Sequence, residues 1–154
     1  MRGEVVLSNF SQIKNVVFAA LAAVGAAAAQ AFGGWDMALR ALLAFMAADY
    51  VTGLLVAAVF RRSPKTERGA LSSRAGFIGL VKKCDILLLV LLAVMLDRAT
   101  GSGFIRAGVC LFFTANEGLS ILENLGLMGV PYPRFLRDML EALRKNGDDG
   151  EDER

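Results

Sequence analysis

The feature that most constrains this chain is the length of its apolar segments. Residues 15–34 carry no charged side chain, and a helix of this length rises about 30 Å, the thickness of a bilayer's hydrocarbon core. Residues 37–60 form a second such segment, interrupted only by Arg40 near its start and Asp49 near its middle. The chain is 55% hydrophobic with a mean hydropathy of +0.50, above the usual range for soluble domains. The sequence therefore predicts a membrane protein.

Two further segments complete the expected fold. Residues 80–99 contain the most apolar run of the chain, and residues 104–127 lead to a turn at Pro131. A proline cannot continue a helix, so the last span should end before it. We expect an all-α integral membrane protein with about four transmembrane helices in a single membrane domain of residues 1–147.

Outside these spans, three segments mix apolar and charged residues. Residues 134–145 place apolar side chains at helical spacing, which predicts an amphipathic cytoplasmic helix. Residues 1–14 and 71–83 combine apolar and charged side chains, so we expect them to lie at the membrane surface. The acidic residues 148–154 are predicted to be a disordered tail.

Basic residues gather between the second and third spans, whereas the turns at 33–36 and 98–103 hold almost none. The positive-inside rule therefore predicts a multi-pass protein of the bacterial cytoplasmic membrane, with this loop and both termini in the cytoplasm. A basic run can also bind nucleic acid, but its place between two apolar spans favours a loop and no nucleic-acid partner. The basic residues of the predicted loop are Arg61, Arg62, Lys65, Arg68, Arg74, Lys82 and Lys83.

The first span leaves one alternative open. The sequence Ala-Gln-Ala at 29–31 resembles a signal-peptidase site after an apolar stretch, and cleavage there would leave three spans in the same orientation. Small residues at a spacing of four also recur in the first two spans, which suits close helix contact. These small residues are Gly25 and Ala29, and Gly53 and Ala57.

The last span carries polar groups where a lipid-facing helix would carry only hydrocarbon. A carboxylate at mid-bilayer costs a few kcal/mol, so such groups should meet a partner, line a pore or meet one another. Asp49, with Thr52 on the same face of the second span, is the expected companion. For Glu123 and Asn124, packing or solvation near the cytoplasmic interface is the alternative. The polar stripe consists of Asn116, Ser120, Glu123 and Asn124, with Glu117 close to it.

The residue types do not indicate an enzyme. The sequence contains no histidine, no nucleophile beside a base and no phosphate-binding loop. Cys84 and Cys110 lie inside apolar blocks, without a CxxC or Cys/His cluster. We therefore expect no disulfide, no metal site and no cofactor.

One block of the chain is specific enough to indicate a family. Residues 116–124 (NEGLSILEN), followed by residues 129–133 (GVPYP), resemble the toxin-secretion/phage-lysis holin family of small bacteriophage membrane proteins. Weaker matches fall in the same order along the chain, and the resemblance covers roughly residues 37–140. These weaker matches are Asp49 with Thr52 and Gly53, Ser72 and Ser73, residues 79–83, and Asp97.

The resemblance implies a mechanism. A holin accumulates in the host cytoplasmic membrane, oligomerises with copies of itself at a set time, and opens lesions through which a phage endolysin reaches the cell wall. The implied partners are the lipid bilayer and a second copy of the chain, with endolysin as a functional partner that need not touch it. Some relatives are associated with toxin release, so protein export is one alternative. A small ion or proton channel that uses Asp49 and Glu117 is another, and the resemblance carries over no catalytic residue.

Overall fold

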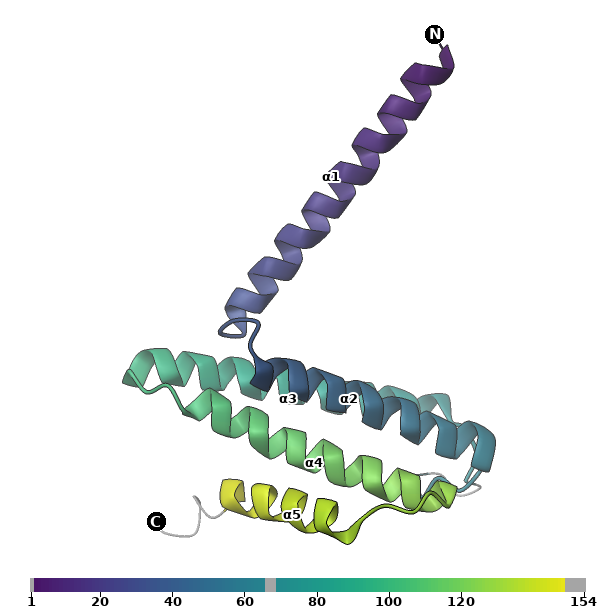
Figure 1. Cartoon of the computed structure of the whole chain (residues 1–154), viewed down its shortest axis with the longest axis vertical. Helices are drawn as coiled ribbons and strands as arrows, with labels where there is room; N and C mark the ends of the chain where they lie inside the picture. Colours follow the sequence, from purple (N-terminus) through teal and green to yellow (C-terminus); the bar gives the residue numbers. More distant parts are fainter. Residues whose placement is uncertain (1, 66–68, 149–154) are drawn as a thin grey trace. The chain divides into compact units, whose positions relative to one another are not determined.

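A computed structural model describes residues 2–65 and 69–148, with the backbone alone described at 2–11 and 146–148. Every regular element in these residues is helical (Figure 1), which confirms the all-α prediction. The contacts divide the chain into two units, Met1–Trp35 and Asp36–Arg154, and each is described by itself. The elements are α1 (Arg2–Ala31), α2 (Met37–Leu55), the π-helical turn η1 (Val56–Phe60), α3 (Ser73–Thr100), α4 (Ile105–Met128) and α5 (Arg134–Asp148).

The first unit is one continuous helix. Helix α1 begins at Arg2, so the residues expected at the membrane surface continue directly into the first predicted span. It ends at Ala31 because Gly33 and Gly34 take positive φ angles of 81° and 111°, which glycine adopts without a Cβ clash. A Cβ placed on Gly25 would meet nothing within 4 Å in the described chain. The face of α1 at Gly25 therefore contacts no other part of this unit.

The second unit is a helical bundle in which α2, α3 and α4 lie side by side and α5 lies along α4 (Figure 1). Asp36 before α2 pairs with Arg106 at the start of α4, while Thr52 late in α2 meets Asn124 late in α4. Helices α2 and α4 therefore run in the same direction. Helix α3, which lies between them in the sequence, runs in the opposite direction. The core is apolar and includes Leu39, Leu42, Met46, Val56, Val90, Val94, Cys110, Ala115 and Leu122.

Helix α3 begins earlier than the sequence predicted. The Ser72 hydroxyl accepts a hydrogen bond from the Ala75 N–H at 3.4 Å, so it caps a helix that runs unbroken from Ser73 to Thr100. The prediction that Arg74, Lys82 and Lys83 lie in the connecting loop is therefore wrong, because this cap starts the helix before them. Of the other predicted loop residues, Arg61, Arg62 and Lys65 do lie in the loop, and Arg68 falls outside the described residues.

Three helical segments in the described chain are long and apolar enough to cross a membrane: Gln12–Ala31, Met37–Phe60 and Ile105–Met128. They correspond to three of the four predicted spans. The span predicted at 80–99 is not among them, because charged residues interrupt its apolar run at both ends. These interrupting residues are Lys82, Lys83 and Asp85 at one end and Asp97 and Arg98 at the other.

The amphipathic helix predicted at 134–145 is α5, which continues to Asp148. The rest of the predicted acidic tail, 149–154, lies outside the described residues. Helix α5 approaches α4 closely at Gly118, where an added Cβ would lie 2.9 Å from the Leu140 side chain. A residue with a Cβ at this position would therefore force the end of the Leu140 side chain to shift, since such a separation is below a normal carbon–carbon contact.

Candidate functional site

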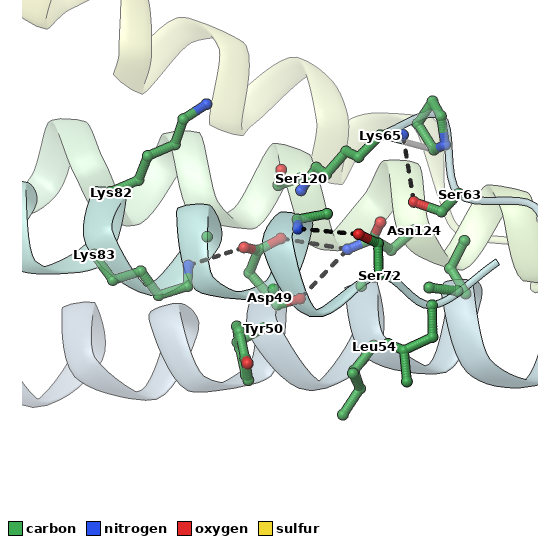
Figure 2. Close-up of a pocket in the computed structure, with 18 of the residues that line it drawn as sticks. Asp49, Tyr50, Leu54, Ser63, Lys65, Ser72, Lys82, Lys83, Ser120 and Asn124 are labelled. Atoms are coloured by element: carbon green, nitrogen blue, oxygen red, sulfur yellow. Dashed lines mark hydrogen bonds and ion pairs between the residues drawn. The ribbon is translucent and has the colours of Figure 1, made fainter. Parts of the chain in front are cut away.

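A buried ion network joins the three central helices. The Lys83 ammonium on α3 donates to Asp49 Oδ2 on α2 at 2.9 Å and also to Glu117 Oε2 on α4. Their side chains are only 13%, 12% and 7% exposed, respectively. Figure 2 shows Lys83 and Asp49 pointing toward each other across the gap between their helices. One lysine thus holds two carboxylates from two neighbouring helices.

Asn124 extends this network toward the end of α4. Its amide nitrogen donates to Asp49 Oδ1 at 3.3 Å and to Thr52 Oγ1 at 3.0 Å. The Thr52 hydroxyl in turn donates to the Asp49 carbonyl oxygen at 3.1 Å. A Cβ on Gly53 would sit 3.7 Å from the Asn124 amide nitrogen, so a small residue leaves room for this bond. We call Asp49, Thr52, Lys83, Glu117 and Asn124 the central network.

The central network is acid-rich. It contains the two carboxylates of Asp49 and Glu117 and the single ammonium of Lys83. Each buried polar side-chain atom in the described residues has a hydrogen-bond partner. The hydrogen bonds of the network are therefore complete, but its two negative charges exceed its one positive charge. A buried charge without a full counter-charge is costly, and the cost is greater in lipid than in water.

A pocket of about 280 Å³ opens beside the central network. It lies between α2, η1, α3, α4 and the loop residues 63–65, 71 and 72, and Figure 2 labels several of its lining residues. Four members of the network line it directly, so the buried charges face a space that a small ligand or water can enter. The remaining polar lining residues are Tyr50, Ser63, Lys65, Ser72, Lys82, Asn116 and Ser120.

The structure divides the predicted polar stripe of the last span. Glu117 and Asn124 are buried in the central network, whereas Asn116 is exposed and Ser120 half-buried at the wall of the pocket. Glu123 is exposed and contributes to neither. Asp49 is a companion of this stripe, as expected, because it contacts Asn124 and shares Lys83 with Glu117.

The small residues of the second span face protein. Ala57 is buried at 8% exposure, and Gly53 lies against Asn124 of α4. The face of α2 that carries them therefore packs inside the chain's own bundle. In the first unit, Gly25 and Ala29 lie on α1, whose apolar segment is unburied in the structure.

A second polar cluster, which the sequence did not predict, lies at the other end of the bundle, around the buried side chain of Arg106. The Arg106 guanidinium donates to both carboxylate oxygens of Asp36, at 2.6 and 3.1 Å. Asp97 accepts hydrogen bonds from the Ile105 and Arg106 N–H groups, both at 3.0 Å, and so caps α4. We call Asp36, Asp97 and Arg106 the turn-end cluster. An arginine at the start of an apolar span was the signal that could have revealed it.

The charge state of Asp36 follows from this geometry. The hydrogen bond from Arg106 and that from the Leu39 N–H lower the pKa of Asp36 from 3.8 to about 2. Asp36 also caps α2, because its Oδ1 accepts the Leu39 N–H at 3.0 Å. One carboxylate thus fixes the start of α2 and ties it to the start of α4.

Lys83 is the member of the central network that sequence reasoning misplaced. It lies next to Cys84 at the edge of the most apolar run. A lysine at the end of a span commonly extends its ammonium group to the membrane interface, so its position alone did not indicate a buried ion pair. Its pairing with helices distant in sequence gave no local signal. As for metals, no group of three or more ligating side chains comes together within residues 2–65 and 69–148.

Comparison with known proteins assigns the chain to a family. The sequence model of the bacteriophage holin family matches residues 26–145, which confirms the resemblance and extends it at both ends. An uncharacterized protein of Clostridium perfringens is 42% identical over 114 residues, covering 73% of this chain and 78% of that protein. An uncharacterized protein of Listeria innocua is 37% identical over 129 residues, covering 82% and 86%.

One relative carries a functional name. A protein named "Probable holin" from Bacillus phage phi105 is 34% identical over 101 residues, which are 65% of this chain and 69% of that protein. No solved structure matches the chain significantly. The matched region includes α2, α3, α4 and most of α5, and therefore both the central network and the turn-end cluster.

Proposed function

The chain belongs to the bacteriophage holin family, and from this premise we propose that it is a holin that oligomerises in the host cytoplasmic membrane. Its lesions would release endolysin for timed host lysis. The observation that carries the proposal is the central network, which buries two carboxylates on one lysine within helices long enough to cross a membrane. Such a network is stable only with help from water or from another subunit.

The proposed topology has four spans and cytoplasmic termini. Helices α2 and α4 run in the same direction, so if both cross the bilayer the chain must return through α3. At 28 residues α3 is about 42 Å long, and its charged ends at Arg74 and Arg98 would reach the two interfaces. Inside this helix, Lys83 is neutralised by its partners, and Lys82 beside it is exposed. The basic loop after α2 favours the cytoplasmic side for that end.

The central network suggests how assembly begins. Within the central network one carboxylate charge is in excess, and the network faces a small pocket that Lys65 and Lys82 also line, both of them exposed. Donors from a second subunit, or water in a shared lumen, would solvate that charge, so the network favours assembly around an aqueous space.

The experiment is to express the chain in bacteria with a large cytoplasmic reporter enzyme, with and without a co-expressed endolysin. A holin should release the reporter abruptly after a fixed delay, and lysis should require endolysin. Cells that express endolysin alone are the control. Ion flux without reporter release would overturn the proposal and support a small ion or proton channel. Reporter release without loss of viability would support protein export.

A further inference from the structure

The pocket beside the central network has a cationic rim. Lys65 on the loop and Lys82 on α3 both line it, and both are exposed. Figure 2 shows the two lysines on the same side of the pocket, with Ser120 between them. Within the described residues, neither lysine takes part in an ion pair. Two ammonium groups thus stand beside one space without a counter-ion from that part of the chain.

The charges around the pocket leave a positive excess. Asp49 and Glu117 also line it, but both are already bound by Lys83. Three lysines against two carboxylates leave one positive charge over. Hydroxyl donors surround the same space, since the Ser63 oxygen accepts the Lys65 N–H at 3.3 Å and keeps its own hydrogen to donate. The chemistry of this pocket suits a small oxyanion with several acceptor oxygens.

Part of the pocket lining is apolar. Leu54 and Leu71 line it as well, and they are 41% and 57% exposed. A free inorganic anion would gain nothing from these side chains, whereas the acyl chains of a lipid would cover them. A ligand with an anionic head and apolar chains therefore fits the pocket better than an anion alone.

We propose that this pocket binds a phosphate-bearing anion, and that its occupant is an anionic phospholipid. The phosphate lies between Lys65 and Lys82, within reach of Ser63 and Ser120, and the acyl chains follow Leu54 and Leu71. The assignment of this lipid to the cytoplasmic leaflet rests on the topology proposed above. Binding itself does not depend on lysis, so the two proposals can fail separately.

The test measures lipid retention by the purified full-length protein. Native mass spectrometry after transfer from mixed micelles counts the bound phosphatidylglycerol and phosphatidylcholine. The test variant is Lys65→Gln/Lys82→Gln. Its matched control is Arg134→Gln/Lys145→Gln, which removes the same charge from α5 at positions that do not line the pocket. Circular dichroism checks that both variants keep their helices.

The native chain should retain phosphatidylglycerol preferentially, and the test variant should bind it about 25-fold more weakly, since each of the two lysines contributes roughly 1 kcal/mol, or about fivefold. The control should bind as the native chain does. In a second arm, inorganic phosphate is added to protein that carries phosphatidylglycerol in phosphatidylcholine micelles, and displacement of the bound phosphatidylglycerol is measured. Displacement of phosphatidylglycerol only by other anionic lipids supports the lipid as occupant, and equal competition by free phosphate identifies a free anion instead. Equal losses in both variants, or no preference in the native chain, would overturn the site.

Discussion

The two polar clusters of the bundle are built in opposite ways. In the turn-end cluster, Arg106 binds both oxygens of Asp36, and Asp97 accepts two main-chain N–H groups at the start of α4. In the central network, a single lysine is shared by Asp49 and Glu117. The first cluster ties helix ends together with defined geometry. The second leaves charge in excess beside a pocket.

This difference separates a structural role from a functional one. Helix caps and a two-pronged arginine–carboxylate pair set where α2 and α4 begin. They would serve any helical bundle with these turns. An acid-rich network at the middle of membrane-length helices makes the single subunit less stable than it need be. We therefore assign the positioning of the helix ends to the turn-end cluster and propose a role in assembly for the central network, and the following variants measure what each contributes to the stability of the bundle.

The largest effect is expected from Lys83→Met. Removal of the only cation in the central network leaves Asp49 and Glu117 buried together without their counter-ion, which should lower the free energy of unfolding by about 3–5 kcal/mol. Thermal unfolding in detergent, followed by circular dichroism, measures the loss. Arg74→Met is the control, because Arg74 is exposed on the same helix and does not line the pocket, and the stability of this variant should stay within about 0.5 kcal/mol of that of the native chain. Equal losses in the two variants would contradict the central network.

A smaller loss is expected from Gly118→Ala. The new Cβ would lie 2.9 Å from the Leu140 side chain and 3.1 Å from the Phe45 side chain, so these side chains must shift and loosen the packing of α5 on α4, at a cost of about 1–3 kcal/mol. Gly126→Ala on the same helix is the control, because its Cβ would meet Tyr132 at an ordinary 3.7 Å. Protease protection of α5 measures the displacement. If α5 is equally protected in both variants, its packing on α4 is not the contact described.

The smallest effect concerns acid stability through Asp36. Its pKa falls from 3.8 to about 2 on folding, so its contribution is fully present above about pH 4 and is lost as the pH falls through 2. Because this carboxylate is 50% exposed, solvent screening reduces the contribution to about 1 kcal/mol. Asp36→Asn should therefore be less stable than the native chain at pH 7 and nearly equal to it at pH 2. Unfolding curves in detergent across this range would reveal a pH-independent gap if the pairing were absent.

The sequence predicted most of the helices because apolar runs and turn residues are local signals. The uncharged run 15–34 indicates a helix, and so does the apolar spacing of 134–145. Pro131 indicates where the last span ends. The start of α3 was missed because the cap at Ser72 lies among basic residues that also suit a loop. A cap is a single hydrogen bond, whereas the loop was inferred from a whole run of charge.

The candidate site was only half predictable. Asp49, Glu117 and Asn124 stood out because polar groups are rare inside apolar spans. Lys83 and Arg106 did not, since a basic residue at the edge of a span is common and its partner lies far away in sequence. Spacing along one helix gives a shared face, but the pairing of helices decides which members of that face are buried. This is why Glu117 is buried and Glu123 is exposed.

The most direct test of the central claim is the lysis time of Glu117→Gln, measured at equal protein level with endolysin and a cytoplasmic reporter. The substitution leaves Asp49 and Lys83 as a balanced pair, so the excess charge that favours assembly is gone. We predict reporter release that is delayed by at least twofold, in a protein as stable as the native chain. Asp49→Asn should act in the same direction. Unchanged release times in both variants would contradict the assignment of assembly to the central network.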